Sequence, residues 1–189
     1  MKTEKGGVLC KKGWINQLIL QLARLGRNCM EPEEIERKLQ IIDDMEKIKR
    51  LQYRYINSLS VMKWDDIVDC FPENGEVDLG YPEGFIIKGK EAISKLFKEG
   101  ISKAHVGKEG LFVVHPVIDV DGDRATGKFV SYFMHLGVNG QPPMVDWVQG
   151  VYDCKYIKVN NQWKISLLKW RPRLKYTKPD MVYIENNLL

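Results

Sequence analysis

The residues best suited to chemistry lie in two segments rich in β-branched and aromatic residues. His135 is near the end of the first segment, and Asp146 is near the start of the second. If the connecting loop centres between Gly140 and Gln141, antiparallel pairing places His135 opposite Asp146, with Cβ atoms roughly 5 Å apart. A carboxylate that holds an imidazole in one tautomer is the arrangement of a general base. The pairing predicts acid–base chemistry, whereas a one-residue slip in register, or a place on a solvated rim, predicts none.

The other two histidines have weaker sequence support. Pro116 favours an extended backbone at His115, and a β-bulge there would remove His115 from regular pairing. His105 lies in the segment KAHVGKEG, which we expect to be a loop able to cover a pocket. Because the three histidines are far apart and show no HxxxH spacing, no metal site is predicted.

Alternation of polar and apolar residues assigns the faces of the two segments. Arg124, Thr126 and Lys128 share one face of residues 124–136, which we expect to contact solvent. The opposite face is then the covered one. It carries Ala125, Gly127, Phe129, Ser131, Phe133 and His135. By the same reasoning, the covered face of residues 144–158 carries Asp146, Val148, Gly150, Tyr152, Cys154 and Tyr156.

The elements that must position these residues follow from hydrophobic spacing. Pro32, Glu33 and Glu34 begin a long helix, whose apolar stripe consists of Ile35, Leu39, Ile42, Met45, Ile48, Leu51, Tyr55 and Leu59. Two shorter helices are predicted around residues 64–71 and 90–101, with short strands in GEVDLG and FIIKG between them. Four long strands then span 111–120, 124–136, 144–158 and 162–171. Helices followed by hairpin-connected strands predict an α+β fold, with the helices against one face of an antiparallel sheet.

Composition narrows the function classes. With 44% hydrophobic and 29% charged residues in 189, the chain is typical of a soluble globular protein. Residues 1–30 contain six lysines or arginines against Glu4 alone, a charge of +5, so the remaining residues carry −1 of the total of +4. A nearly neutral body argues against nucleic-acid binding. The four cysteines contain no CxxC pair, which indicates a reduced, cytoplasmic protein.

The first thirty residues predict a separate extension. Within residues 13–25, apolar side chains recur at helical spacing and lysines precede them, so a basic amphipathic helix is expected there. This helix is a candidate for contact with a membrane surface, with its own domain or with a second copy of the chain. The predicted organisation is an N-terminal helical extension over 1–30, one domain over 31–174 and a C-terminal tail over 175–189.

Four segments carry a resemblance to a known family: YRYINSLSVMKWDDIVDCFPENGEVDLG, GKEAISKLFKEGI, HPVIDVDGDRATGKF and YDCKYIKVNNQWKI. In their order of helix, turn and strand signals, they resemble the SnoaL-like branch of the superfamily named after nuclear transport factor two. The resemblance covers about residues 43–174. It implies a cone, in which a curved antiparallel sheet wraps a long helix and two shorter ones around a mostly apolar pocket. Relatives of this kind include scytalone dehydratases, bile-acid 7-alpha-dehydratases, ketosteroid isomerases, polyketide cyclases and non-catalytic binding modules.

The resemblance to the dehydratases implies roles residue by residue. Tyr55 matches their helix tyrosine, while the aspartate expected about five residues later falls on Ser60. The expected histidine falls on Leu111, with His105 or His115 as displaced substitutes, and the second aspartate falls near Phe133. Arg171 or Arg173 is placed to supply a cation, although Pro172 holds the nearest aligned position.

Two functions remain open. One is a cofactor-independent dehydratase, isomerase or cyclase acting on a small hydrophobic ring-containing substrate, with no metal or organic cofactor. Its expected catalytic residues are Tyr55, His135 and Asp146, and its expected substrate-binding residues are Ser60, Trp64, His115, Phe129, Ser131, Phe133, Val148, Tyr152, Trp170 and Arg171. The other is a non-catalytic module for ligand binding or oligomerisation. A homo-oligomer, a dimer or trimer, is expected through the convex side of the sheet, which carries Val130, Tyr132, Met134, Trp147 and Val151.

Overall fold

The structure is a computed structural model that describes residues 17, 30–80, 86–107, 109–136 and 145–178. It forms two compact units, residues 1–41 and residues 42–189. The helix predicted within residues 13–25 and the tail beyond residue 178 lie outside the described residues, apart from residue 17. The fold and the candidate site described below belong to the second unit.

The helices begin and end close to their predicted positions. Helix α2 (Pro32–Ser60) starts with Pro32 and two glutamates in its first turn, as expected. Helix α3 (Trp64–Asp69) follows after a short turn. Helix α4 (Lys90–Lys95) continues as a π-helical turn, η1 (Leu96–Gly100), and a 3₁₀ turn, η2 (Ile101–Ala104).

The strands form one six-stranded sheet in the order β2-β1-β6-β5-β4-β3. Its members are β1 (Glu76–Asp78), β2 (Ile87–Lys88), β3 (Gly110–Asp121), β4 (Arg124–Leu136), β5 (Val145–Val159) and β6 (Gln162–Lys178). The long strands are joined in antiparallel succession, and β1 pairs in parallel with β6. The predicted α+β class is confirmed.

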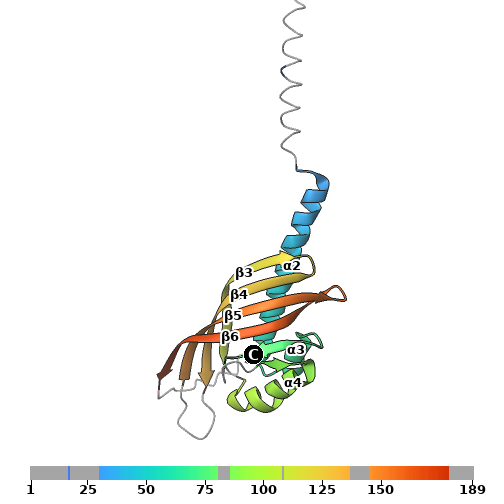
Figure 1. Ribbon diagram of the computed structural model, residues 1–189. Coiled ribbons are helices and arrows are strands. Elements are labelled where there is room, and N and C mark those ends of the chain that lie inside the picture. Colours follow the sequence, from blue (N-terminus) through green and yellow to red (C-terminus); the bar gives the residue numbers. More distant parts are fainter. Residues whose placement is uncertain (1–16, 18–29, 81–85, 108, 137–144, 179–189) are drawn as a thin grey trace, which may run out of the picture. The chain divides into compact units, whose positions relative to one another are not determined.

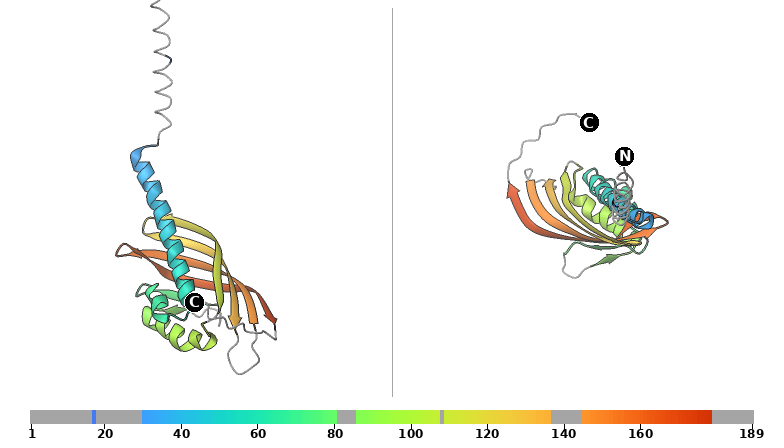
Figure 2. Two further views of the ribbon diagram at one scale, coloured as in Figure 1. Left: turned by 180° about the vertical axis from the view of Figure 1, so that it is seen from behind. Right: turned by 90° about the horizontal axis from the view of Figure 1, so that it is seen from above.

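The sheet curves around the part of α2 that belongs to the second unit, as Figures 1 and 2 show. The alternation predicted for β4 holds. Phe129 and Ser131 are buried on the concave side, while Thr126 and Lys128 are exposed on the convex side. The concave side therefore holds the core, and the convex side is open in the described chain.

Polar contacts attach α2 to the far end of the sheet. The carboxylate of Asp44 is buried and accepts a hydrogen bond from Trp163 Nε1 at 2.7 Å. Lys158 Nζ lies 3.0 Å from the other oxygen of Asp44. Further along the helix, the Tyr156 hydroxyl donates to Gln52 Oε1 at 2.9 Å. These contacts fix which face of α2 points toward the sheet.

The apolar stripe of α2 is buried along only part of its length. Ile35, Leu39 and Ile42 are exposed. Within the second unit, Ile48 is the first apolar residue of the stripe to be fully buried. Hydrophobic spacing alone does not tell which residues of an apolar stripe are buried.

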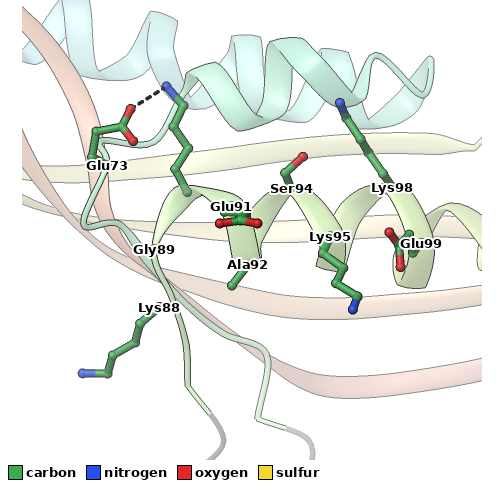
Figure 3. Close-up of a pocket in the computed structure, with 10 residues that line it drawn as sticks. Glu73, Lys88, Gly89, Glu91, Ala92, Ser94, Lys95, Lys98 and Glu99 are labelled. Atoms are coloured by element: carbon green, nitrogen blue, oxygen red, sulfur yellow. Dashed lines mark ion pairs between the residues drawn. The ribbon is translucent and has the colours of Figure 1, made fainter.

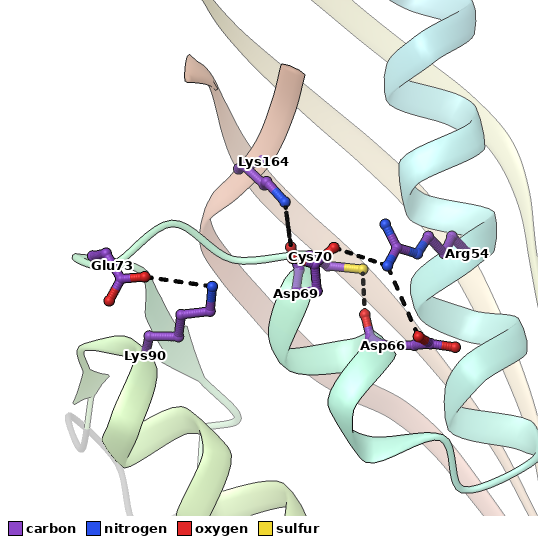
Figure 4. Close-up of polar contacts among 7 residues, drawn as sticks. All are labelled: Arg54, Asp66, Asp69, Cys70, Glu73, Lys90 and Lys164. Carbon is purple, nitrogen blue, oxygen red and sulfur yellow. Dashed lines mark hydrogen bonds and ion pairs between the residues drawn. The ribbon is translucent and has the colours of Figure 1, made fainter. Parts of the chain in front are cut away.

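Helix α3 is held by an ion-pair network that Figure 4 shows. Arg54 Nη2 on α2 lies 2.9 Å from Asp69 Oδ2, and Lys164 Nζ on β6 donates to the Asp69 carbonyl oxygen at 2.6 Å. Burial alone raises the pKa of Asp69, but the hydrogen bond from Arg54 and the charge of Lys164 lower it below its usual value. Cys70 Sγ donates to the Asp66 carbonyl oxygen at 3.2 Å. The network therefore links α3 to both α2 and the sheet.

The β-bulge predicted around His115 is present. The register of β3 against β4 shifts between Val114 and Val117. His115 itself has φ +52°, in the left-handed region, so the extended conformation expected from Pro116 is wrong at this residue. The bulge inserts extra backbone into β3, and this outweighs the steric preference that proline imposes on its predecessor.

Candidate functional site

Tyr55 lies at the centre of a buried aromatic cluster. Its ring makes edge contacts with Phe71, Phe97 and Tyr152, with ring centroids 6.0 to 6.3 Å apart. Burial raises the pKa of Tyr55 well above its ordinary value, and a hydrogen bond with Tyr152 opposes this rise. Burial raises the pKa of Tyr152 as well. The two phenols are therefore neutral at physiological pH, which suits Tyr55 as a hydrogen-bond donor and not as a phenolate.

A wall of aromatic and small polar residues adjoins this cluster. The ring of Phe133 stacks on Trp170 at 5.4 Å with an interplanar angle of 18°, and it also contacts Tyr152. Trp170 Nε1 donates to the buried hydroxyl of Ser131 at 3.1 Å. Gly150 leaves room for Trp170, because a Cβ atom at residue 150 would lie only 2.6 Å from Trp170 Nε1. The sequence-predicted residues Phe129, Ser131, Phe133, Tyr152 and Trp170 are thus brought together on the concave side.

The register predicted between His135 and Asp146 is confirmed, since these residues are partners across β4 and β5. Phe133 pairs with Val148 in the same ladder, which places Val148 two residues from Asp146. Asp146 Oδ2 also lies 2.8 Å from Lys175 Nζ on β6. The side chain of His135 lies outside the described part of the chain, so its hydrogen bond with Asp146 stays a prediction.

A histidine–glutamate pair that the sequence reasoning missed lies beside this register position. His105 Nδ1 is 3.7 Å from Glu109 Oε1, and the Glu109 side chain is 0% exposed. Glu109 directly precedes Gly110, which pairs with Met134, so Glu109 comes next to the position of His135. The available signals were the i, i+4 spacing from His105 and the place two residues before Leu111.

Trp64 packs against the His105–Glu109 pair. Its ring meets the His105 ring edge-on, with centroids 6.1 Å apart. Trp64 is partly buried and packs against the hydrophobic core. Sequence reasoning named both Trp64 and His105 but found no partner for the histidine. The fold supplies two partners, one from α3 and one from the segment that leads into β3.

Three predicted substrate-binding residues lie elsewhere. Arg171 alternates with Trp170 along β6, so it lies on the convex side, where its Nη2 pairs with Asp78 Oδ2 at 2.7 Å. His115 is exposed at the bulge. Ser60 ends α2, and its hydroxyl donates to the Ile56 carbonyl oxygen at 3.1 Å. The structure therefore does not bring these three side chains to the aromatic wall.

A hollow of about 830 Å³ on the surface of α4 contains none of the predicted residues. Figure 3 shows lysines and glutamates around it, among them Lys88, Glu91, Lys95 and Glu99. Its lining mixes both charge signs, so it offers no single class of ligand a matching surface. Among the described residues there is no group of three or more His, Cys, Asp or Glu side chains arranged to hold a metal ion. Nor does any described helix have both the length and the apolar character needed to cross a membrane.

Comparisons with known proteins add the family. Residues 40–169 match the family model described as the SnoaL-like domain. The sequence matches no curated protein. A putative scytalone dehydratase from Novosphingobium aromaticivorans superposes with a TM-score of 0.63 at 23% identity, over 78% of this chain and 94% of that one.

Two further solved structures share the fold. A hexachlorocyclohexane dehydrochlorinase, LinA type 2, gives a TM-score of 0.68 at 13% identity, over 78% of this chain and 97% of that one. An NTF2-like protein with a cystatin-like fold from Novosphingobium aromaticivorans gives 0.57 at 19% identity, over 74% and 88%. At these identities the likeness shows the fold alone.

Proposed function

Because the chain belongs to the SnoaL-like domain family, we propose that it is a cofactor-independent acid–base enzyme of the lyase or isomerase type. Its substrate is a small hydrophobic molecule that contains a ring. The structural neighbours, a putative scytalone dehydratase and a hexachlorocyclohexane dehydrochlorinase, support this class of reaction by analogy of fold. The residues of this chain carry the rest of the proposal.

One observation carries it: residues able to exchange protons gather at one end of the sheet, beside an aromatic wall. Glu109, His135, Asp146 and Lys175 come from the segment before β3 and from β4, β5 and β6, which are neighbours in the sheet. We name them the strand-end group. Phe133 lies two residues from His135 on β4 and stacks on Trp170. Such a mixture of flat apolar surface and a few polar groups is typical of small-molecule sites.

The proposed chemistry starts with loss of a proton from a ring carbon next to an electron-withdrawing group. His135, oriented by Asp146, takes this proton. In an elimination, the electron pair left on the carbon forms a double bond as hydroxide or halide leaves the neighbouring carbon. In an isomerisation, the electron pair shifts an existing double bond, and His135 returns the proton to the far carbon of the conjugated system. Tyr55 donates a hydrogen bond to the oxygen on which negative charge develops. The exclusion of water from the aromatic surroundings strengthens this hydrogen bond.

Three probe molecules test the proposal. Purified protein is incubated with 3-hydroxycyclohexanone, hexachlorocyclohexane and 3-cyclohexenone, and products are followed by NMR spectroscopy. We expect elimination or double-bond migration on at least one probe, with rates about 100-fold lower in Asp146→Asn. Asp153→Asn, a substitution at an exposed position of the same strand, serves as the matched control. The absence of turnover on every probe, or equal rates in both variants, would contradict the proposal.

A second candidate function is supported by the filled core. The side chains of Tyr55, Phe71, Phe97, Phe129 and Tyr152 are almost fully buried against one another. Such a core is sufficient for a non-catalytic module that binds a flat ligand or only forms oligomers, because neither role requires catalytic groups. Tight binding of a probe without turnover supports this alternative.

The convex side of the sheet supports a proposed homo-oligomer. Phe112 on β3 stacks on Tyr132 of β4 at 5.4 Å, while Trp147 is 45% exposed and Leu174 62% exposed. Register places Phe112, Tyr132 and Leu174 in one row across the sheet, with Trp147 in the next row. Apolar patches of this kind mark contact surfaces, so we propose that a second copy of the chain covers the convex side.

A cytoplasmic location also stays a proposal, based on the cysteine pattern.

A further inference from the structure

We propose that Glu109 makes the site specific for ring compounds that carry a hydroxyl group. The hydroxyl group of such a compound donates a hydrogen bond to Oε2 of the Glu109 carboxylate. His105 acts as a positioning residue for Glu109. The inference rests on the proposed function, because it names the substrate class of the same site. It also predicts that the site prefers hydroxylated rings to purely halogenated ones.

The two oxygens of Glu109 have different surroundings. Oε1 accepts a hydrogen bond from the backbone N–H of Val106 at 2.5 Å and faces His105 Nδ1 at 3.7 Å. Oε2 is buried and has no hydrogen-bond partner among the described residues. One oxygen therefore holds the side chain in place, and the other lacks a hydrogen-bond donor among the described residues.

A buried carboxylate oxygen without a donor is unusual. Folded proteins pair almost all buried polar groups, because an unpaired group loses its hydration without replacement. An exception in a native fold calls for an explanation, and a functional site is one. A substrate hydroxyl supplies the missing donor, and the charged acceptor makes the bond stronger than a neutral one.

The surroundings of Glu109 match a hydroxylated ring. Leu111, two residues along the chain, is the register partner of Phe133, whose ring stacks on Trp170. Glu109 is followed by Gly110, whose partner Met134 directly precedes His135. A ring against the aromatic wall therefore has the Glu109 carboxylate at the same end of the sheet as His135 and Asp146.

Rigid neighbours hold the pair in position. Trp64 packs edge-on against the ring of His105 and also against the core. The segment that leads to His105 is a π-helical turn followed by a 3₁₀ turn, two departures from regular helix that often occur near functional sites. The imidazole in turn limits the orientations open to the Glu109 carboxylate.

Two probes of equal ring size test the inference. The affinities of the full chain for 2-naphthol and for naphthalene are measured by fluorescence titration. The expected result is a preference for 2-naphthol of about ten-fold or more, because naphthalene leaves the carboxylate unpaired. A chain that binds both probes equally, or neither, overturns the proposal.

Variants assign the preference to Glu109. Glu109→Leu is expected to abolish it, mainly by raising the affinity for naphthalene, while Glu109→Gln keeps the acceptor for Val106 and reduces the preference. Glu99→Gln, at an exposed position of η1, is the matched control and leaves the preference unchanged. His105→Phe lowers the preference without changing the affinity for naphthalene. If Glu109→Leu does not fold, Glu109→Gln alone decides, and an unchanged preference in it overturns the assignment.

The outcomes distinguish this inference from the proposed function. Turnover on the elimination probes without a preference for 2-naphthol leaves the enzyme proposal standing and removes the role of Glu109. A preference for 2-naphthol without turnover supports the role of Glu109 in a binding module. The two experiments use different measurements, so neither result depends on the other.

Discussion

Replacing Asp44 tests how the sheet is attached to α2. Asp44 is 2% exposed and has partners on both of its oxygens, Trp163 Nε1 at 2.7 Å and Lys158 Nζ at 3.0 Å. Asp44→Asn keeps the size of the side chain but removes its charge. The amide can still accept from Trp163 in one orientation, whereas Lys158 loses its closest anion.

The size of the stability loss expected for Asp44→Asn follows from these contacts. A hydrogen bond to a charged group contributes about 1.5 to 3 kcal/mol, and breaking a buried ion pair costs about 3 to 5 kcal/mol. Lys158 keeps part of its compensation, since its Nζ lies 4.9 Å from the centre of the Trp163 ring and 3.7 Å from Asp123. We therefore expect a loss of about 3 kcal/mol in the free energy of unfolding.

Urea unfolding followed by circular dichroism measures this loss. Asp44→Asn, Lys158→Met and the double variant form a cycle that isolates the energy of the pair. Asp43→Asn is the matched control, because Asp43 forms an exposed ion pair with Lys47 and should leave the midpoint unchanged. A loss below about 1 kcal/mol in Asp44→Asn, or a coupling energy near zero in the cycle, would refute the reasoning.

Three other substitutions have definite expected results. Gly150→Ala should lower the free energy of unfolding by about 1 to 3 kcal/mol and change the tryptophan fluorescence, because the new Cβ atom would meet Trp170 at 2.6 Å. The hydrogen bond from Arg171 lowers the pKa of Asp78 below 3.8, so their pair stabilises the fold above that pH and loses this effect as pH falls through the lowered pKa. Arg171→Gln should therefore be less stable than the wild type at neutral pH, with the difference shrinking in acid. Urea unfolding of both proteins, from neutral pH down to the lowered pKa of Asp78, measures this stability difference. A difference that grows in acid contradicts the expectation. Trp147→Lys should halve the mass seen by light scattering if the convex side joins two copies; an unchanged oligomer would exclude this residue from the interface.

The sequence by itself determined the elements and the register of the long strands. Alternation along residues 124–136 and the turn signals between strands are local properties, so they can be interpreted without a structure. They were enough to pair His135 with Asp146 and to place Phe129 and Ser131 on the covered side. The start of α2 at Pro32 followed from equally local rules of helix termini.

Only the tertiary structure decided which side chains meet across elements. Glu109 and Trp64 lie on different elements, yet both come against His105. Ile42 fits the apolar stripe of α2 but stays exposed, and Arg171 finds its ion-pair partner in Asp78 of β1. Local spacing determines the direction of a side chain within its own helix or strand. What lies opposite depends on how distant segments pack, and in the described part of the chain that packing buries one carboxylate oxygen of Glu109 without a hydrogen-bond donor.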